Sequence, residues 1–263
     1  MWSRYIDHVL QPVQDARGAQ VHEPTVYSAC TCFASEHRAL SKLGVRAKYP
    51  VACDPKYESY MFLRENSAEE DYVHHFHDLH NLADNGKDLC YRCRQVCTLT
   101  TDGDTGHRTV VSGISCLPYT TSRVGRADGT TAHAEAGLLT KAISLALRVD
   151  ADELWIENVM GLTHRESKLE LKSPLQLALE EAQLRAPEYH CMVYFTDARA
   201  AGVLNRRRVW IHMLHQRRGG AEAHQRMNDM VKAANCVHGN SFVGCLSLVG
   251  MRGVSPPVRS AQL

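Results

Sequence analysis

Polar and thiol side chains follow four short apolar runs of the sequence. Asp54 ends YPVACD, Asp78 ends VHHFHD, Cys116 ends GISC, and Glu157 lies within LWIENV. A deprotonated thiol is a strong nucleophile, whereas a carboxylate can hold a ribose or stabilise charge that develops in a reaction. Because open α/β sheets bind their ligands at the carboxyl ends of the strands, this order of groups predicts one shared site.

The elements that position these groups alternate along the chain. Strands are predicted at residues 26–30, 49–54, 73–79, 110–115, 154–159, 189–196 and 208–214, and helices at 37–44, 56–66, 136–149 and 173–185. This alternation predicts an α/β fold in which a mostly parallel twisted sheet carries helices on both faces. Residues 81–109 are polar and lack apolar periodicity, so we expect a loop insertion there.

The composition limits the classes of protein to which the chain can belong. Its 263 residues include 30 Lys and Arg against 29 Asp and Glu, and this near balance excludes a cationic field over the whole molecule. No apolar run approaches the ~18 residues of a membrane-spanning helix, and the first residues resemble no secretion signal. We therefore expect an intracellular protein that does not bind a membrane.

Ten cysteines are a high count for such a protein, and three of them stand close together in CYRCRQVC. A zinc site on Cys90, Cys93 and Cys97 would need a fourth ligand, which His107 or His80 could supply. Alternation along a strand would divide the neighbouring histidines between the two faces of the sheet: His74, His75, His77 and His80. We therefore expect free thiols and predict no metal site.

Three linked segments, GISCLPYTTSRVG, LWIENVMGL and AAGVLNRRRVWIHML, resemble the C5-cytosine-specific DNA methyltransferases. That family has a Pro-Cys nucleophile loop, then a Glu-Asn-Val strand, then a Gln-x-Arg-x-Arg segment entering a strand, in the same order. The resemblance implies a Rossmann-like fold that binds S-adenosyl-L-methionine (AdoMet). It also implies four catalytic residues: Cys116, Glu157, Arg206 and Arg208.

The implied reaction gives each of these side chains a role. The Cys116 thiolate adds to C6 of a cytosine that has been flipped out of its stack, which raises the electron density at C5. Glu157 binds the N3 and N4 edge of the base and stabilises charge as the adduct forms. Arg208 and Arg206 hold the base carbonyl, Glu157 or the nucleic-acid backbone.

The resemblance extends to the cofactor AdoMet through ACTCFASEHRALSKLGV, ACDPKYESY, HDL and HGNSFVGCLSLVG. The residues that it implies for cofactor binding are Thr31, Cys32, Asp54, Asp78, Leu79, Asn240 and Ser241. Departures from the family pattern occur beside the nucleophile, where Ser115 replaces the Pro and Leu117 the Gln, and in the cofactor half. The stretch from Cys30 to Ser35 contains no glycine where the family has a glycine-rich loop, and Ala52 replaces an acidic residue that would hold the ribose.

The domains that we expect are an N-terminal extension (1–25), a catalytic domain (26–215), a reduced recognition region with a returning cofactor segment (216–250) and a tail (251–263). Five arginines, at positions 206, 207, 208, 217 and 218, are expected to form a basic patch that meets phosphate. DNA is the expected partner, in the nucleus if the source is eukaryotic. Two alternatives stay open: a methyltransferase of tRNA, and a non-catalytic nucleic-acid-binding or regulatory protein with this fold.

Overall fold

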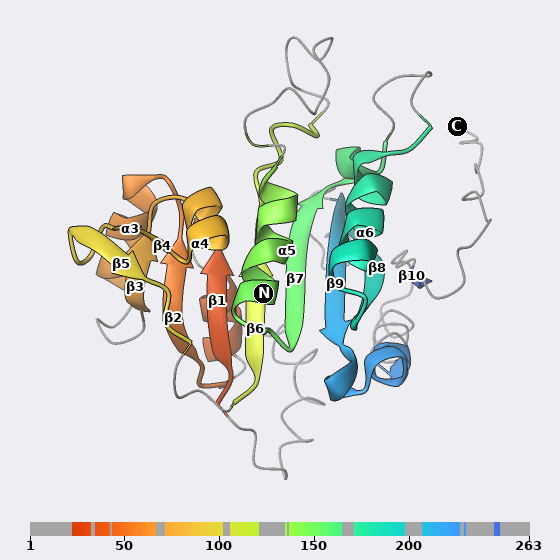
Figure 1. Ribbon diagram of the computed structural model, residues 1–263, viewed down its shortest axis with the longest axis horizontal. Helices are drawn as coiled ribbons and strands as arrows, with labels where there is room; N and C mark the ends of the chain where they lie inside the picture. Colours follow the sequence, from red (N-terminus) through yellow and green to blue (C-terminus); the bar gives the residue numbers. More distant parts are fainter. Residues whose placement is uncertain are drawn as a thin grey trace, which may run out of the picture.

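The computed structural model describes residues 23–32, 35–42, 44–66, 72–101, 106–120, 135, 137–164, 171–197, 207–226, 229 and 245–247. These residues form one ten-stranded sheet in the order β10-β8-β9-β7-β6-β1-β2-β3-β4-β5 (Figure 1). The strands are β1 Thr25–Ala29, β2 Lys48–Cys53, β3 Tyr72–Phe76, β4 Lys87–Cys90, β5 Gln95–Thr98, β6 Arg108–Ser112, β7 Glu153–Val159, β8 Tyr189–Asp197, β9 Arg207–His215 and β10 Cys245–Ser247.

The centre of the sheet is parallel. β3, β2, β1, β6 and β7 run in one direction, while β9 lies antiparallel between β7 and β8. Short antiparallel strands close both edges, with β10 beside β8 and the β4–β5 hairpin beside β3. The predicted mostly parallel α/β sheet is confirmed.

Helices cover both faces of this sheet, as predicted. On one face lie α4 Leu79–Asn85, α5 Leu138–Arg148 and α6 Pro174–Arg185 (Figure 1), and on the other α2 Ser35–Lys42 and α3 Tyr57–Asn66. Alternation along β1 explains the two layers, because Tyr27 belongs to the large core under α4, α5 and α6, whereas Val26 packs with Leu40 and Leu63 on the other side. Parallel strands buried on both faces read as continuous apolar runs, which is why the sequence located them.

Local signals fix where the helices begin and end. Ser173 caps α6, with its hydroxyl accepting from the amide of Gln176 while the Gln176 side chain accepts from the amide of Ser173. Asp78 caps α4, and Gly86 ends it in the left-handed conformation, at φ 67°. These caps set the point at which each chain segment leaves the sheet edge.

The expected loop at 81–109 is wrong over most of its length. The stretch contains the end of α4 and both strands of the β4–β5 hairpin. Each of these strands has only four residues, and β5 is exposed over three of its four, so no apolar alternation marks it. The turn at residues 91–94 and the edge of β3 specify the hairpin instead.

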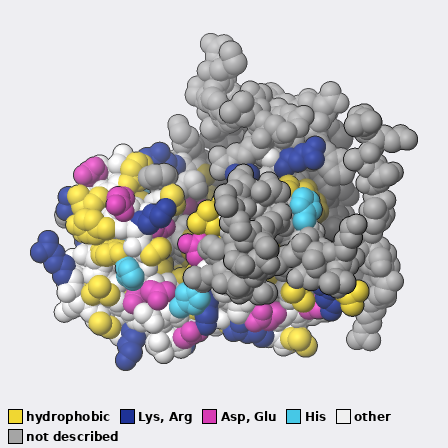
Figure 2. Space-filling view, turned by 90° about the horizontal axis from the view of Figure 1, so that it is seen from above, with side chains coloured by type: hydrophobic (Ala, Val, Ile, Leu, Met, Phe, Trp, Pro, Cys, Tyr) yellow, Lys and Arg dark blue, Asp and Glu magenta, His cyan; other side chains and the backbone are white. Residues whose placement is uncertain are grey.

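Seen from above, the described surface mixes hydrophobic side chains with charges of both signs (Figure 2). This mixture agrees with the formal net charge of +1. In the part of the chain that the structure describes, no helix combines the length and the apolar character needed to cross a membrane.

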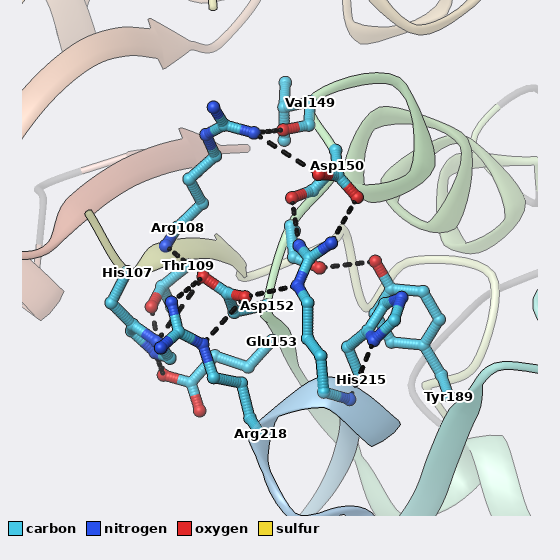
Figure 3. Close-up of polar contacts among 12 residues, drawn as sticks. His107, Arg108, Thr109, Val149, Asp150, Asp152, Glu153, Tyr189, His215 and Arg218 are labelled. Atoms are coloured by element: carbon cyan, nitrogen blue, oxygen red, sulfur yellow. Dashed lines mark hydrogen bonds and ion pairs between the residues drawn. The ribbon is translucent and has the colours of Figure 1, made fainter. Parts of the chain in front are cut away.

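A polar network joins the strands at their amino-terminal edge (Figure 3). Asp152, which is 2% exposed, accepts from the guanidinium groups of Arg217 and Arg218 at 2.7 and 2.8 Å and from the Arg108 amide at 2.9 Å. The neighbouring carboxylate, Glu153, contacts His107 and His212 at 3.0 and 3.2 Å and accepts from Thr109 at 2.9 Å. The network therefore links β6, β7 and β9 through two acidic side chains.

Hydrogen bonding decides the ionisation of both acids. Burial opposes their charge, but the bonds from Arg218, the Arg108 amide and Arg217 outweigh it and lower the pKa of Asp152. In the same way, His107 and His212 lower the pKa of Glu153 against the effect of burial. A carboxyl group with a lowered folded-state pKa stabilises the fold above its unfolded pKa of about 4, and this stabilisation is lost as the pH falls.

We predict that Asp152→Asn lowers the free energy of unfolding by about 2–4 kcal/mol at pH 7, because it leaves two arginines without their shared buried partner. Urea unfolding measures the change. The wild type should lose stability on acidification below about pH 5, and the variant should lose less. Glu180→Gln, which breaks an exposed pair with Lys172, should cost under about 1 kcal/mol, and an equal loss in both variants would contradict the prediction.

Candidate active site

The order of the strands changes direction between β1 and β6. After β1 the chain adds β2 and β3 on one side, whereas β6 and β7 lie on the other side of β1. Such a switch in direction separates the turns that leave two adjacent strands, and it is the usual ligand site in open α/β sheets. Here these turns are residues 30–32, after β1, and residues 113–116, after β6. The carboxyl end of β1 lies at the upper edge of the sheet in Figure 1, and a Cβ at Gly113 would lie 3.8 Å from the Cys30 carbonyl oxygen, so the two turns are neighbours.

The turn after β1 adopts a glycine-like backbone without glycine. Cys30 and Cys32 have φ values of 54° and 48°, in the left-handed region that costs most non-glycine residues about 1 kcal/mol or more. Hydrogen bonds to the ends of β1 and β2 hold the turn in place. The Thr31 amide donates to the Cys53 carbonyl at 3.0 Å, and the Thr31 hydroxyl donates to the Ser28 carbonyl at 3.0 Å.

Asp54 connects this turn with the one that follows β2. Its carboxylate, 7% exposed, accepts from the amide of Cys32 at 2.9 Å and from the amide of Lys56 at 3.0 Å. A carboxylate offers about four acceptor positions, so it could accept from ribose hydroxyls in addition to these two amides. Ala52, where the family has an acid, is fully buried in the core under α2 and α3. Asp54 is therefore the acidic side chain of this strand end that retains acceptor positions beyond its two backbone bonds.

Asp78 and Leu79 lie at the end of the next strand, where α4 begins. The Asp78 side chain accepts from the His80 amide at 2.8 Å, and its own amide donates to Asp88 at 2.5 Å. Leu79 is the first helical residue, so its N–H has no acceptor within the helix. A carboxylate beside such an N–H offers the acceptor and the donor that an adenine amine and ring nitrogen require. The residues at this edge therefore offer hydrogen-bonding groups of the kinds that a nucleoside requires.

Cys116 is an exposed thiol at the carboxyl edge, as is Cys32 on the turn after β1. Cys116 lies in a turn that is closed by a bond from the Tyr119 amide to the Cys116 carbonyl at 2.9 Å. Cys30, on the neighbouring turn, is a poor competitor because burial, together with the charge of Asp54, raises the pKa of its thiol to about 12. Since the thiolate is the reactive form, exposure favours Cys116 over Cys30 as the nucleophile.

Asn158 fixes the turn that carries Cys116. It is 2% exposed, and its amide nitrogen donates to the carbonyls of Ile114 and Ser115 at 3.3 and 3.5 Å. Its side-chain oxygen accepts from the Val159 amide at 2.7 Å. Sequence reasoning placed Asn158 in a motif but gave it no role. The available signal was a polar side chain at an inward-facing position of a strand.

Glu157 and Arg208 form an ion pair across two antiparallel strands. β7 and β9 pair so that Glu157 lies opposite Trp210 and Val159 opposite Arg208, which makes the two charged residues diagonal neighbours. Both side chains are partly buried, at 29% and 22% exposure, so solvent screens the pair only in part. The parallel pairing of Ser112 with Ile156 brings this pair next to the turn after β6.

Some predicted residues do not join this group. Arg206, Asn240 and Ser241 lie outside the described residues. Arg217 and Arg218 belong to the polar network at the opposite edge, about 30 Å along the nine residues of β9, where they bind acids. The predicted basic patch is therefore wrong for these two arginines.

The segment that follows β9 packs on the sheet. It starts with the short helix Gln216–Arg218, and residues 220–226 form a further helical stretch. His224, from this stretch, contacts His212 of β9 at 2.9 Å, and β10 pairs with β8 at the sheet edge.

No protein-family model matches the sequence, and a search of curated proteins finds no relative. Among solved structures, DNMT2 from Spodoptera frugiperda aligns with a TM-score of 0.47 and 14% identity over 73% of this chain and 50% of that chain. The Dnmt2 methyltransferase from S. pombe aligns with a TM-score of 0.48 and 13% identity over 74% and 50%. The chain spans about half the length of these proteins, and at this identity the likeness concerns the fold alone.

The backbone at Gly161 packs closely against the turn that carries Cys116. A Cβ at Gly161, in the short helix Met160–Thr163, would lie 1.6 Å from the Tyr119 carbonyl oxygen. Gly161→Ala must therefore displace the turn, and we predict a loss of about 1–3 kcal/mol in the free energy of unfolding and an altered alkylation rate at Cys116. Mass spectrometry of the Cys116 peptide measures that rate.

Gly113→Ala is the matched control, because its Cβ would meet only the Cys30 carbonyl at 3.8 Å, an ordinary contact. This variant should keep both the stability and the alkylation rate of the wild type. Equal behaviour of the two alanine variants would show that the Cys116 turn does not depend on Gly161.

Proposed function

We propose that the chain is an AdoMet-dependent enzyme that methylates C5 of cytosine in DNA through a covalent bond between Cys116 and C6. The observation that carries the proposal is the grouping at the carboxyl edge. An exposed Cys116 lies on a turn held by Asn158, beside the strand that presents the Glu157–Arg208 pair. Asp54 and Asp78 follow the neighbouring strands β2 and β3, where they would bind a nucleoside.

Cysteine chemistry makes C5 of cytosine, which is otherwise a poor nucleophile, reactive toward a methyl group. The Cys116 thiolate forms a bond to C6, and the C5–C6 electron pair moves to C5, which becomes nucleophilic. AdoMet, when bound, supplies a methyl group on a positively charged sulfur. C5 would take this methyl group as the methyl–sulfur bond breaks and leaves a neutral thioether, and loss of the C5 proton to a base would return the electron pair that breaks the C6–S bond. The thiolate is regenerated, so Cys116 is unchanged over the cycle.

The Glu157–Arg208 pair orients and stabilises the base. The Glu157 carboxyl group can bind N3 and the N4 amine of a flipped cytosine, where charge develops as the thiolate adds. Arg208 fixes the direction of this carboxyl group and brings a positive charge to the pocket. Placing both residues on rigid paired strands keeps their geometry constant during the reaction.

The turn after β1 supports a second candidate, a nucleic-acid-binding protein with this fold and no catalysis. Glycine in a cofactor loop lets the backbone approach its ligand closely, whereas Cys30 and Cys32 add side chains to that surface. Such a protein would bind oligonucleotides without binding AdoMet. Binding of AdoMet therefore separates the two candidates.

We predict that AdoMet binds to the full chain and that Asp54→Asn weakens the binding about 5- to 100-fold, since the amide loses charge and half of its acceptor capacity. Isothermal titration calorimetry measures both constants. Asp84→Asn, the same change at an exposed acid paired with Lys141, should bind AdoMet like the wild type. A wild type that binds oligonucleotides but not AdoMet would favour the second candidate.

The covalent step can be trapped. With AdoMet present, the wild type should form a stable adduct with an oligonucleotide that contains 5-fluorocytosine, because fluorine cannot leave C5 as a cation and the C6–S bond therefore persists. Denaturing electrophoresis detects the adduct, and peptide mapping should place it on Cys116. Cys116→Ser should form none, since a serine hydroxyl is almost wholly protonated near pH 7.

Cys191→Ala provides the control for loss of a thiol elsewhere, because Cys191 is buried in β8. It should trap the oligonucleotide as the wild type does. Trapping on DNA and RNA of the same sequence, compared side by side, identifies the substrate. An adduct that persists in Cys116→Ser would mean that another group is the nucleophile.

A further inference from the structure

Four metal-ligating side chains meet where β3 contacts the β4–β5 hairpin. His74 comes from β3, Cys90 ends β4, Cys93 lies in the turn, and Cys97 belongs to β5. The candidate ligand atoms, one nitrogen and three sulfurs, all lie within 4.8 Å of one another. Residues separated by up to 23 positions therefore converge on one point at the left end of the sheet in Figure 1.

The distances suit a tetrahedral metal ion. The Nδ1 atom of His74 lies 3.6 Å from the Cys93 sulfur and 3.7 Å from the Cys90 sulfur. Zinc binds sulfur at ~2.3 Å and nitrogen at ~2.0 Å, and a tetrahedral angle between two such bonds separates the ligand atoms by ~3.5 Å. The side chains therefore need only small movements to surround an ion.

The backbone of the hairpin turn is shaped to present sulfur. The Arg94 amide donates to the Cys90 carbonyl at 2.8 Å, and Arg94 itself adopts a left-handed φ of 56°. The His75 amide points at the Cys90 sulfur, 3.4 Å away. An amide directed at a ligand sulfur stabilises the thiolate form that binds metal.

The hairpin has little apolar burial of its own to hold it. Its two strands have four residues each, and a single residue pair, Phe76 with Cys90, joins it to β3 in register. Val96 is 64% exposed and Leu89 44%, and hydrophobic side chains are gathered at this end of the surface (Figure 2). Backbone bonds from the His77 amide to the Leu89 carbonyl and from the Tyr91 amide to the His75 carbonyl also join the hairpin to the β3 segment, and a metal ion bound between them would add a cross-link.

We propose that His74, Cys90, Cys93 and Cys97 form a structural zinc site that fixes the β4–β5 hairpin to β3. Three thiolates and one imidazole are a ligand set typical of zinc, and four protein ligands leave no open position for catalysis. The bound ion and its ligands carry a net charge of −1, and the same turn supplies the cations Arg92 and Arg94.

The structure changes the choice of the fourth ligand. The sequence offered His107 or His80 for this position and led us to expect free thiols. His107 instead pairs with Glu153 at the amino-terminal edge, and His80 lies in the first turn of α4. Side chains alternate between the two faces of the sheet along β3, so His75 is buried while His74 lies beside the thiols. This alternation makes His74 the fourth ligand.

The hairpin also holds two turns of the carboxyl edge. Asp88 of β4 accepts from the amide of Asp78 and from the side chain of Asn81, at 2.5 and 3.1 Å. Tyr91, next to Cys90, donates to the Pro55 carbonyl at 2.8 Å. The proposed ion therefore stabilises the segment against which the Asp54 and Asp78 turns are held.

Zinc content of the tag-free full chain, purified with a thiol reductant, tests the site directly. Elemental analysis should find about one zinc per chain, and X-ray absorption should show three sulfurs at ~2.3 Å and one nitrogen at ~2.0 Å. Hydrogen exchange across residues 72–99 should rise when a chelator removes the ion. These measurements do not depend on methyl transfer. The zinc proposal can therefore be wrong while the proposed function is right, and the proposed function can be wrong while the zinc proposal is right.

Variants identify the ligands. Cys93→Ala removes an exposed thiol with no packing role and should abolish zinc binding, as should His74→Ala. Cys93→His should restore about one zinc per chain, which a merely structural thiol would not explain. Cys116→Ala and His80→Ala, the matched controls, should retain the zinc of the wild type.

Three results would overturn the proposal: a wild type without zinc after reconstitution under reducing conditions, a disulfide between two of the three cysteines, and undiminished zinc in Cys93→Ala. Iron or copper in place of zinc would overturn the identity of the ion. If Cys93→Ala fails to fold, the stoichiometry and absorption spectrum of the wild type still decide.

Discussion

The buried side-chain amide of Asn158 is the contact on which the candidate active site depends. Its nitrogen binds two carbonyls of the turn after β6, and its oxygen binds the backbone of β7. A buried amide left without partners costs about 1–3 kcal/mol, so the turn and the strand end are held in one relative position. This contact determines where Cys116 lies relative to Glu157.

The amino-terminal edge of the sheet holds a stabilising polar network, whereas the carboxyl edge holds the candidate active site. At the amino-terminal edge, Asp152 and Glu153 satisfy their charges with arginines and histidines of adjacent strands, which stabilises the arrangement of β6, β7 and β9. At the carboxyl edge, the turns carry strained backbone at Cys30 and Cys32 and an exposed thiol at Cys116. Strain and exposed reactive groups are costly, and a rigid network elsewhere offsets that cost.

Much of the fold could be predicted from the sequence because strands that are buried on both faces of the sheet appear as continuous apolar runs. Such runs can be recognised without knowing which strands they pair with. The strands β2, β3, β6 and β7 were located in this way, although β3 and β6 each end three residues before the predicted positions, and with them the neighbouring side chains of Asp54, Asp78, Cys116 and Glu157. The β4–β5 hairpin was missed because its strands are short and exposed, so pairing with β3 rather than residue pattern specifies it.

Other features depend on partners that are distant in sequence. In the sequence, Arg217 and Arg218 cannot be distinguished from the arginines at positions 206–208. In the structure, β9 runs antiparallel to β7 and places Arg217 and Arg218 beside Asp150 and Asp152. His74 approaches the three cysteines only through the register of β3 with the hairpin. Neither contact can be predicted from the spacing of these residues along the chain.

The most direct measurement of the central claim is the position of a transferred methyl group. The full chain is incubated with AdoMet labelled in its methyl group and with DNA or RNA, the nucleic acid is digested to nucleosides, and the labelled product is identified by mass spectrometry. The account predicts label at C5 of cytosine, dependent on Cys116. Label on N4 of cytosine, or on any other base, would contradict a mechanism built on a thiolate adduct at C6.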